Sequence, residues 1–179
     1  DVWYPGEKGG TAVAETLFGE NNPAGRLPLT FYRSLDDLPP FDDYDFTKRT
    51  YKYFEGPVLY PFGYGLSYTQ FRYSALKVED CGETVDVSFT LKNTGRYDGD
   101  EVAQVYTRLA DYEGKSPQKE LRGFQRIHLK RGESRRVTIS LRREDLRYWS
   151  ESQSRFIVPE GLPTVMVGAS SADIRLSTE

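Results

Sequence analysis

Apolar and polar residues alternate along much of the chain after Phe71, with the two-residue period of a β-strand. The clearest case is "TVDVSFTLKN" at 84–93, where Val85, Val87, Phe89 and Leu91 are expected to face inward. Further strands are predicted at "EVAQVYTRL", "KELRGFQRIHL", "SRRVTISL", "LRYWS", "SRFIVP" and "PTVMVGAS", with a single helical turn near "REDL". Glycine-bearing turns such as "KRGES" separate several of them. About seven short strands at this spacing are typical of a β-sandwich.

The predicted fold class is therefore mainly β, an immunoglobulin-like or fibronectin-III-like sandwich over residues 71–179. The one cysteine, Cys81, excludes an internal disulfide and any site that needs several thiolates. The one histidine, His128, alternates with two apolar residues and is expected to point to solvent.

Residues 1–33 have a different pattern. We predict a helix from Thr11 to Phe18, with Thr11 as its N-cap and Gly19 as its C-terminal glycine. "RLPLTFY" reads as a short strand, in which Leu29 and Phe31 alternate with polar neighbours. One helix and one strand cannot bury a core alone, so this segment needs partners elsewhere.

Residues 34–70 are rich in proline, aspartate and aromatics without a sustained period, which predicts a connector lying against a folded surface. Its acidic residues suggest calcium as an alternative to a solvated loop, but the glycine-turned spacing of a calcium loop is missing. They are Asp36, Asp37, Asp42, Asp43 and Asp45. "PGEKGG" before the helix lacks the ending of a phosphate loop and is interpreted as a tight turn.

Composition excludes several function classes. The 24 basic and 27 acidic residues are interspersed and leave a net charge of −3, which does not favour a nucleic-acid partner. No apolar run approaches the roughly 20 residues of a membrane helix. The chain begins without a methionine or a signal segment, and we expect it to be part of a longer protein.

Four long motifs and the tail, in order, resemble the C-terminal part of glycoside hydrolase family 3, the β-glucosidases and β-xylosidases. "WYPGEKGGTAVAETLFGENNPAGRLPLTF" resembles the end of the family's α/β sandwich domain. "RTYKYFEGPVLYPFGYGLSYTQF" is similar to its connector. "VSFTLKNTGRYDGDEVAQVYTR" and "SPQKELRGFQRIHLKRGESRRVTISL" are similar to strands of its fibronectin-III-like domain, and "IVPEGLPTVMVGASSADIRL" matches the closing strands.

The resemblance implies a retaining β-glycosidase, which needs two carboxyl groups about 5–5.5 Å apart. In the family the nucleophilic aspartate lies in an N-terminal barrel domain, and the acid/base precedes the "WYPGE" segment. This chain is therefore expected to contain no catalytic residue, metal or cofactor, and Glu7 is interpreted as part of a structural loop. Its partners would be the missing barrel and α/β domains, through which a β-linked glycoside is bound. A periplasmic or extracellular location is expected for the parent enzyme.

Three segments follow from this interpretation: residues 1–33 as the end of the α/β sandwich domain, 34–70 as the connector and 71–179 as the fibronectin-III-like sandwich. The aromatic stretch "YPFGYGLSYTQF" lies where the helix–strand pattern ends and the alternating strand pattern begins. It is predicted to be an inter-domain joint. The joint residues are Tyr60, Phe62, Gly63, Tyr64, Gly65, Tyr68 and Phe71. Trp3 and Tyr4 are candidates for the rim of the parent's sugar pocket, with packing against the missing sheet as the alternative.

Two other hypotheses stay open. One is a free-standing β-sandwich module that binds polysaccharide or another partner, although such a module has no use for an isolated helix and strand. The other is one piece of a multi-chain or permuted enzyme whose catalytic carboxylates lie on the other piece. In the fragment interpretation, residues 1–33 should be mobile, docked on the sandwich or paired with another copy.

Overall fold

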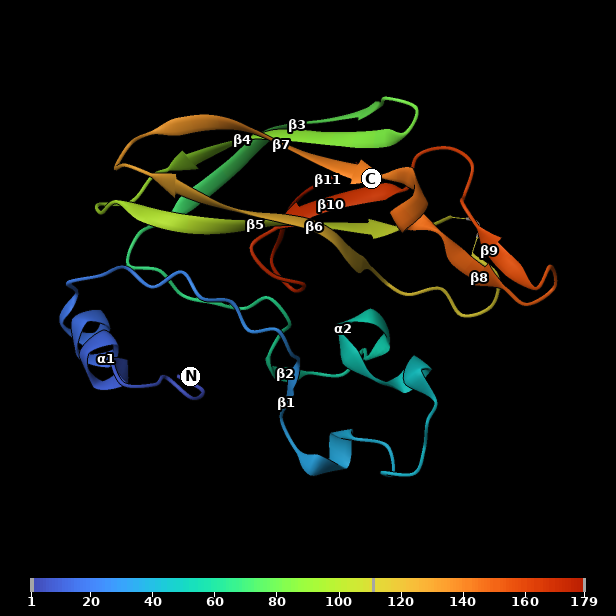
Figure 1. Cartoon of the computed structure of the whole chain (residues 1–179), viewed down its shortest axis with the longest axis horizontal. Helices are drawn as coiled ribbons and strands as arrows, with labels where there is room; N and C mark the ends of the chain where they lie inside the picture. The colour runs from blue at the N-terminus through green and yellow to red at the C-terminus, as the bar shows by residue number, and fades with distance from the viewer. Residues whose placement is uncertain (1, 111, 179) are drawn as a thin grey trace.

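Two antiparallel sheets form the main body of the computed structural model, which describes residues 2–110 and 112–178. One sheet has the order β3–β4–β7, formed by Phe71–Asp80, Thr84–Asn93 and Ser134–Arg142. The other has the order β11–β10–β5–β6, formed by Ile174–Ser177, Thr164–Gly168, Gly99–Arg108 and Glu120–Leu129. The sheets are stacked face to face (Figure 1), which confirms the predicted β-sandwich.

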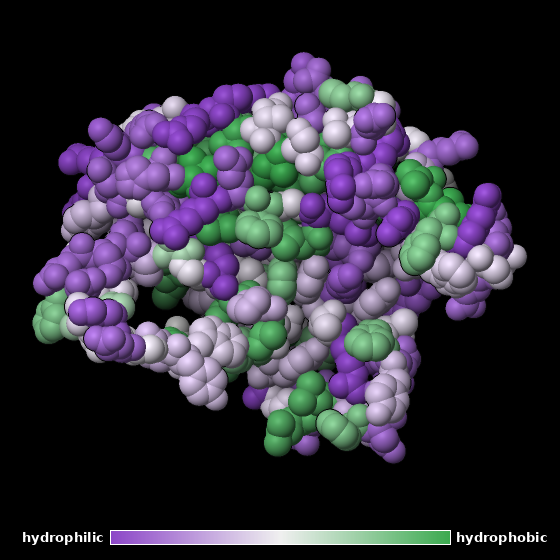
Figure 2. Space-filling view, in the orientation of Figure 1, coloured by the Kyte–Doolittle hydropathy of each residue, from purple (hydrophilic) through white to green (hydrophobic). Residues whose placement is uncertain are grey.

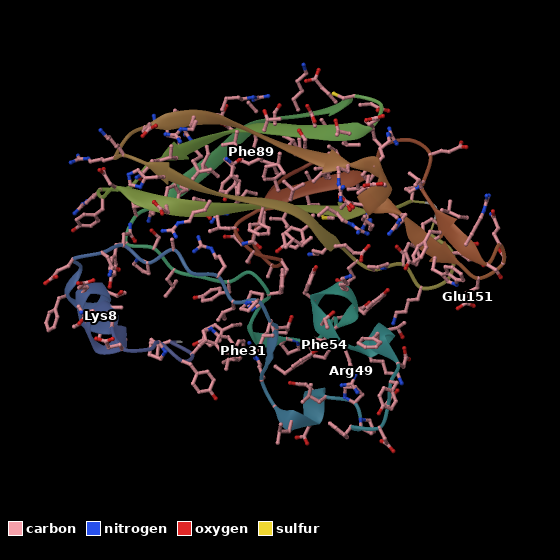
Figure 3. All side chains as sticks on the ribbon, viewed as in Figure 1. Lys8, Phe31, Arg49, Phe54, Phe89 and Glu151 are labelled. Carbon is pink, nitrogen blue, oxygen red and sulfur yellow. The ribbon has the colours of Figure 1, made fainter. Side chains whose placement is uncertain are left out.

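The core lies between the two sheets. All four residues of β4 that were predicted to face inward have no exposed surface: Val85, Val87, Phe89 and Leu91. Figure 3 shows Phe89 in the space between the layers. Burial of each such side chain stabilises the fold by about 1.5–3 kcal/mol. The period-two pattern of this strand follows because one face of its sheet packs against the core and the other faces away from it.

Two of the predicted strands lie outside the sandwich. β8 (Tyr148–Ser150) and β9 (Arg155–Ile157) pair with each other as a separate two-stranded sheet. β3 and β11 take their places in the sandwich. The sandwich therefore has seven strands, as predicted, but two of them are not the predicted ones. The turn predicted near "REDL" is confirmed as a 3-10 helix, Arg143–Leu146 (η3).

Helix α1 spans Gly9–Phe18 and begins earlier than predicted. Its N-cap is Lys8, whose carbonyl accepts from the Ala12 amide at 3.0 Å, so the prediction of Thr11 as N-cap was wrong. The turn at Gly6 (φ +68°) lets the chain enter the helix before Thr11. The C-terminal end is as predicted, because Gly19 has φ +78°.

Of the strand predicted in "RLPLTFY", only Phe31–Tyr32 (β1) pairs, with Val58–Tyr60 (β2). Pro28 has no amide proton to donate to a ladder, which limits the strand on its N-terminal side. The rest of the connector holds three short helical turns below the sandwich (Figure 1). They are η1 (Leu35–Asp37), η2 (Phe46–Lys48) and α2 (Thr50–Tyr53).

Three of the five connector aspartates accept hydrogen bonds from the nearby backbone. Asp37 and Ser34 form a capping box on η1, and the Asp45 carboxylate accepts from the Thr47 amide at 2.9 Å. The Asp43 carboxylate accepts from the Asp45 amide, and this hydrogen bond is the main cause that lowers the pKa of Asp43. These carboxylates therefore act as turn caps, the ordinary role of aspartate in such segments.

His128 lies on β6 between two buried residues, and 59% of its side chain is exposed, as predicted. Its Nδ1 lies 2.6 Å from Oδ1 of Asp100 on the neighbouring strand β5. Among the described residues, no helix is long and apolar enough to cross a bilayer.

Candidate functional site

Residues 60–68, the aromatic loop, contact the N-terminal segment through their backbone. The amide of Leu27 donates to the carbonyl of Tyr64 at 2.9 Å, and the amide of Gly63 donates back to the carbonyl of Leu27 at 2.7 Å. Gly63 has φ +79°, a conformation in which residues with a Cβ are strained. A Cβ on Gly65 would lie 2.2 Å from the carbonyl oxygen of Gly25, so the two segments approach too closely for any other residue there.

The same loop is bonded to the sandwich on its other side. The side chain of Gln104, on β5, donates from Nε2 to the carbonyl of Gly63 at 3.1 Å and to that of Ala169 at 2.7 Å. The hydroxyl of Tyr106 donates to Oε1 of Gln104 at 2.5 Å, and the amide of Ser171 donates to the carbonyl of Phe62 at 2.9 Å. Gln104 is only 3% exposed, so these hydrogen bonds are shielded from water.

An aromatic stack joins α2 to the loop and to β5. Tyr51 stacks on Phe62 with ring centroids 4.3 Å apart, and its edge meets Tyr106 at 5.9 Å. The hydroxyl of Tyr51 accepts from the amide of Leu121 at 3.0 Å. Burial raises the pKa of Tyr51 and of Tyr106, so both stay neutral hydrogen-bonding groups at physiological pH.

A buried ion pair makes a second link between the N-terminal segment and the sandwich. Nη2 of Arg26 lies 3.0 Å from Oε1 of Glu101, and the two side chains are 10% and 6% exposed. Tyr73 of β3 is buried beside them, and burial together with the nearby charge of Glu101 raises its pKa well above the usual value. Because β3 and β5 belong to different sheets, Arg26 approaches both layers of the sandwich.

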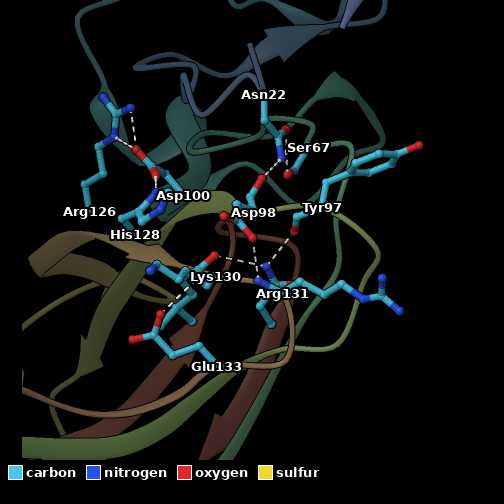
Figure 4. Close-up of polar contacts among 12 residues, drawn as sticks. Asn22, Ser67, Tyr97, Asp98, Asp100, Arg126, His128, Lys130, Arg131 and Glu133 are labelled. Atoms are coloured by element: carbon cyan, nitrogen blue, oxygen red, sulfur yellow. Dashed lines mark hydrogen bonds and ion pairs between the residues drawn. The ribbon is translucent and has the colours of Figure 1, made fainter. Parts of the chain in front are cut away.

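Asn22 makes a third link, shown in Figure 4. Its Nδ2 donates to the carbonyl of Asp98 at 3.0 Å, while its Oδ1 accepts from the hydroxyl of Ser67 and the amide of Tyr68 at 3.0 and 2.8 Å. The hydroxyl of Tyr68 donates to the carbonyl of Thr16 in α1 at 2.6 Å. A single amide side chain thus connects the N-terminal segment, the aromatic loop and the turn before β5.

The predicted joint residues occupy different environments. Tyr60 and Tyr64 lie against each other at 5.2 Å, and Tyr60 also meets Phe31 of β1 edge to face at 6.2 Å. Tyr60 and Tyr68 remain 41% and 47% exposed. Phe71 differs, because it begins β3 and lies in the sandwich core. We therefore assign Phe71 to the core and leave it out of the joint.

Trp3 and Tyr4 lie on the surface, 55% and 100% exposed. Other large apolar side chains of the first 66 residues are exposed as well. They include Leu17, Phe18, Leu29, Leu35, Phe41, Tyr44, Phe46, Leu59 and Leu66. In Figure 2, pale and green side chains gather at the lower edge of the view, over the connector. Exposed apolar surface of this extent is unusual for a folded domain.

Sequence reasoning missed the polar residues that complete these links: Asn22, Arg26, Glu101 and Gln104. All four lie within the family motifs quoted above, but neither hydrophobic periodicity nor turn chemistry gives any of them a role. One indication of a covering layer was present in "EVAQVYTRL". Ala103 and Val105 lie on the core face of β5, and Gln104 and Tyr106 on the opposite face are buried as well. A strand buried on both faces must be covered by a further layer, and here that layer is the aromatic loop.

The chemistry of this site is that of an anchor. Glu101, the one buried carboxylate among the described residues, is paired with a buried guanidinium.

Comparisons with known proteins agree with this architecture. Residues 1–68 match the family model "Glycosyl hydrolase family 3 C-terminal domain", and residues 101–171 match "Fibronectin type III-like domain". A xylan 1,4-beta-xylosidase of Xylanibacter ruminicola is 42% identical over 96% of this chain. A probable beta-glucosidase L of Aspergillus fumigatus is 37% identical over 97% of it.

Solved structures show the same fold. The GH3 beta-glucosidase of Bifidobacterium adolescentis superposes with a TM-score of 0.90 at 34% identity over 99% of this chain. The chain spans 28% of that structure, 20% of the Xylanibacter relative and 28% of the Aspergillus relative. The two successive domain matches and the similarity over nearly the whole chain show that this protein belongs to glycoside hydrolase family 3 and corresponds to the C-terminal part of its members.

Proposed function

We propose that the chain is the C-terminal part of a retaining β-glycosidase, a β-glucosidase or β-xylosidase that removes terminal β-linked sugars. Both catalytic carboxylates would lie in upstream domains. The observation that carries this proposal is the aromatic loop, which is hydrogen-bonded to Leu27 on one side and to Gln104 on the other. It bonds the region that matches the family's C-terminal domain to the region that matches its fibronectin-III-like domain.

In this proposal the segments 1–33, 34–70 and 71–179 have separate roles. The first completes the α/β domain, the second carries α2 and the aromatic loop, and the third braces both. The ion pair of Arg26 with Glu101 and the hydrogen bonds of Asn22 would hold the first segment in one orientation relative to the third. A fixed orientation matters because small displacements of an active-site wall reduce catalysis strongly.

The exposed apolar face of residues 2–66 would be covered by the upstream barrel and α/β domains. Helix α1 supports this, since Gly9 is its only buried residue while Leu17 and Phe18 are 75% and 84% exposed. A helix with an uncovered apolar face is stable mainly when that face packs against a partner. Trp3 and Tyr4 would lie within this covered surface, at or near the rim of the sugar pocket.

The proposal is tested with a chimera in which this chain replaces the corresponding segment of the Xylanibacter ruminicola relative. The chimera is expected to hydrolyse an aryl β-xyloside, whereas the relative truncated before that segment is expected to be inactive. The unmodified relative serves as the positive control. A soluble, folded chimera without activity would contradict the proposed role.

The chain by itself is expected not to hydrolyse aryl β-glucosides or β-xylosides, because in this proposal both catalytic carboxylates lie in upstream domains. Release of p-nitrophenol by the purified chain measures this. Turnover that disappears when one of the chain's own acids is mutated would overturn the proposal.

In the isolated chain, the amides of α1 are expected to exchange with solvent far faster than those of β4. The helix has few buried contacts, whereas the side chains of β4 fill the core. Hydrogen exchange with mass spectrometry compares the two segments, and the chimera should slow the exchange of α1. Equal protection of α1 and β4 in the isolated chain would mean that residues 1–33 need no further domain.

A further inference from the structure

The β8–β9 hairpin projects from the end of the sandwich opposite α1 (Figure 1). It is held by the loop before β6 rather than by either sheet. Tyr112 stacks on Tyr148 with centroids 4.8 Å apart. The carboxylate of Glu113 accepts from the hydroxyl of Ser150 at 2.5 Å and from the amide of Ser152 at 3.0 Å. The hairpin is thus fixed in place without being buried in the core.

Two large aromatic rings are exposed on this hairpin. Trp149 and Phe156 face each other across the strands, edge to face, with centroids 5.3 Å apart, and they are 49% and 58% exposed. The guanidinium of Arg147 lies 4.9 Å from the ring of Phe156 and restrains it further. Green side chains stand out over the hairpin in Figure 2. Rings that are rigid and exposed are a feature of recognition surfaces.

A groove of about 510 Å³ runs along β9, and Phe156 lines it together with polar groups, whereas Trp149 lies outside the lining and supports Phe156 edge to face. Phe156 and Tyr148 provide its aromatic part, and Gln153, Arg155 and Glu160 its polar part. Nε and Nη2 of Arg155 both donate to Oε1 of Gln153, at 3.0 and 2.8 Å. These two bonds orient the guanidinium and the amide before any ligand arrives.

The charges in the groove favour a neutral ligand, because Arg155 and Glu160 have opposite signs. A pyranose ring matches the rest of the lining. Its C–H face can pack on an aromatic ring, and its hydroxyls can pair with amide, guanidinium and carboxylate groups at the edge. We propose that the β8–β9 groove binds a neutral β-linked oligosaccharide chain. The choice of β-linked sugars rests on the proposed function, whereas the groove and its lining do not.

The experiment titrates the purified chain with xylohexaose and with cellohexaose in a calorimeter. Binding in the millimolar range is expected, as suits an open groove. Trp149→Ala removes the ring that holds Phe156 at the groove and should weaken binding about three- to tenfold. Arg155→Met keeps both rings and should weaken binding through the lost hydrogen bonds. Circular dichroism verifies that each variant is folded.

Phe124→Ala is the matched control, because Phe124 is also a largely exposed aromatic on a strand of the sandwich, 67% exposed on β6. It should leave the affinity unchanged. Absence of binding to both sugars, or equal losses in Trp149→Ala and Phe124→Ala, would overturn the proposal. Binding of an unrelated extended peptide in preference to the sugars would also overturn it, since it would identify β9 as a strand-pairing edge.

The two proposals fail separately. An active chimera together with a chain that binds neither hexasaccharide would refute only the groove. Binding that Trp149→Ala weakens, together with an inactive folded chimera, would refute only the proposed function.

Discussion

Replacing Glu101 by alanine is expected to lower the free energy of unfolding by about 3–5 kcal/mol. The substitution leaves the Arg26 guanidinium, whose side chain is 10% exposed, without its carboxylate partner. A buried charge that loses its partner keeps its desolvation cost and loses the attraction that offset it. For a chain of this length the midpoint of thermal unfolding should fall by roughly 10 °C. Denaturant titration followed by circular dichroism measures the change.

Two further variants test whether burial of the ion pair causes the loss of stability in Glu101→Ala. Lys77→Ala removes an exposed ion pair with Glu79, in which the side chains are 61% and 51% exposed, and should cost less than about 1 kcal/mol. The double variant Arg26→Met/Glu101→Leu replaces the buried pair by apolar groups and should recover most of the loss. Similar losses for Glu101→Ala and Lys77→Ala would show that Arg26 and Glu101 are hydrated in solution.

Gly63→Ala is expected to destabilise the chain by about 2–5 kcal/mol. One part of the effect is the backbone, since φ is +79°. The other is Gln104, because a Cβ at Gly63 would lie 2.1 Å from its Oε1. Moving that side chain breaks its bonds to the carbonyls of Gly63 and Ala169 and to the hydroxyl of Tyr106. Thermal unfolding of the purified variant measures the loss.

The matched control is Gly82→Ala, because Gly82 has φ +81° and nothing within 4 Å of the position of a Cβ. It shares the backbone strain without the collision and should cost only about 1 kcal/mol. Adding Gln104→Ala to Gly63→Ala removes the colliding atom, so the two losses should be less than additive. Equal effects of Gly63→Ala and Gly82→Ala would mean that the loop is not packed against Gln104.

Both variants also connect the joint to the proposed enzyme. In the chimera, Gly63 and Glu101 are distant in sequence from any upstream carboxylate. If either alanine variant lowers the activity per folded molecule, the joint orients the catalytic domains. The proposed hairpin groove predicts the opposite, since Trp149→Ala should leave hydrolysis of a small aryl glycoside unchanged.

The sequence by itself determined the β-sandwich. Alternation in 84–93 identified the four buried residues of β4, and turn residues separated the strands. Helix α1 was predicted except for its first turn. These features depend on neighbours along the chain, and side-chain direction in a strand or helix has a short period. The family could also be identified from the sequence, because its motifs are long and occur in the family's order.

Only the tertiary structure decided which strands share a sheet and which polar residues complete the joint. "LRYWS" and "SRFIVP" have strand patterns as good as others but form a separate hairpin. Arg26 and Glu101 are 75 residues apart, and Gln104 is 41 residues from Gly63. Nothing local distinguishes a charged residue that will be buried from one that stays in water, because burial depends on which distant segment covers it.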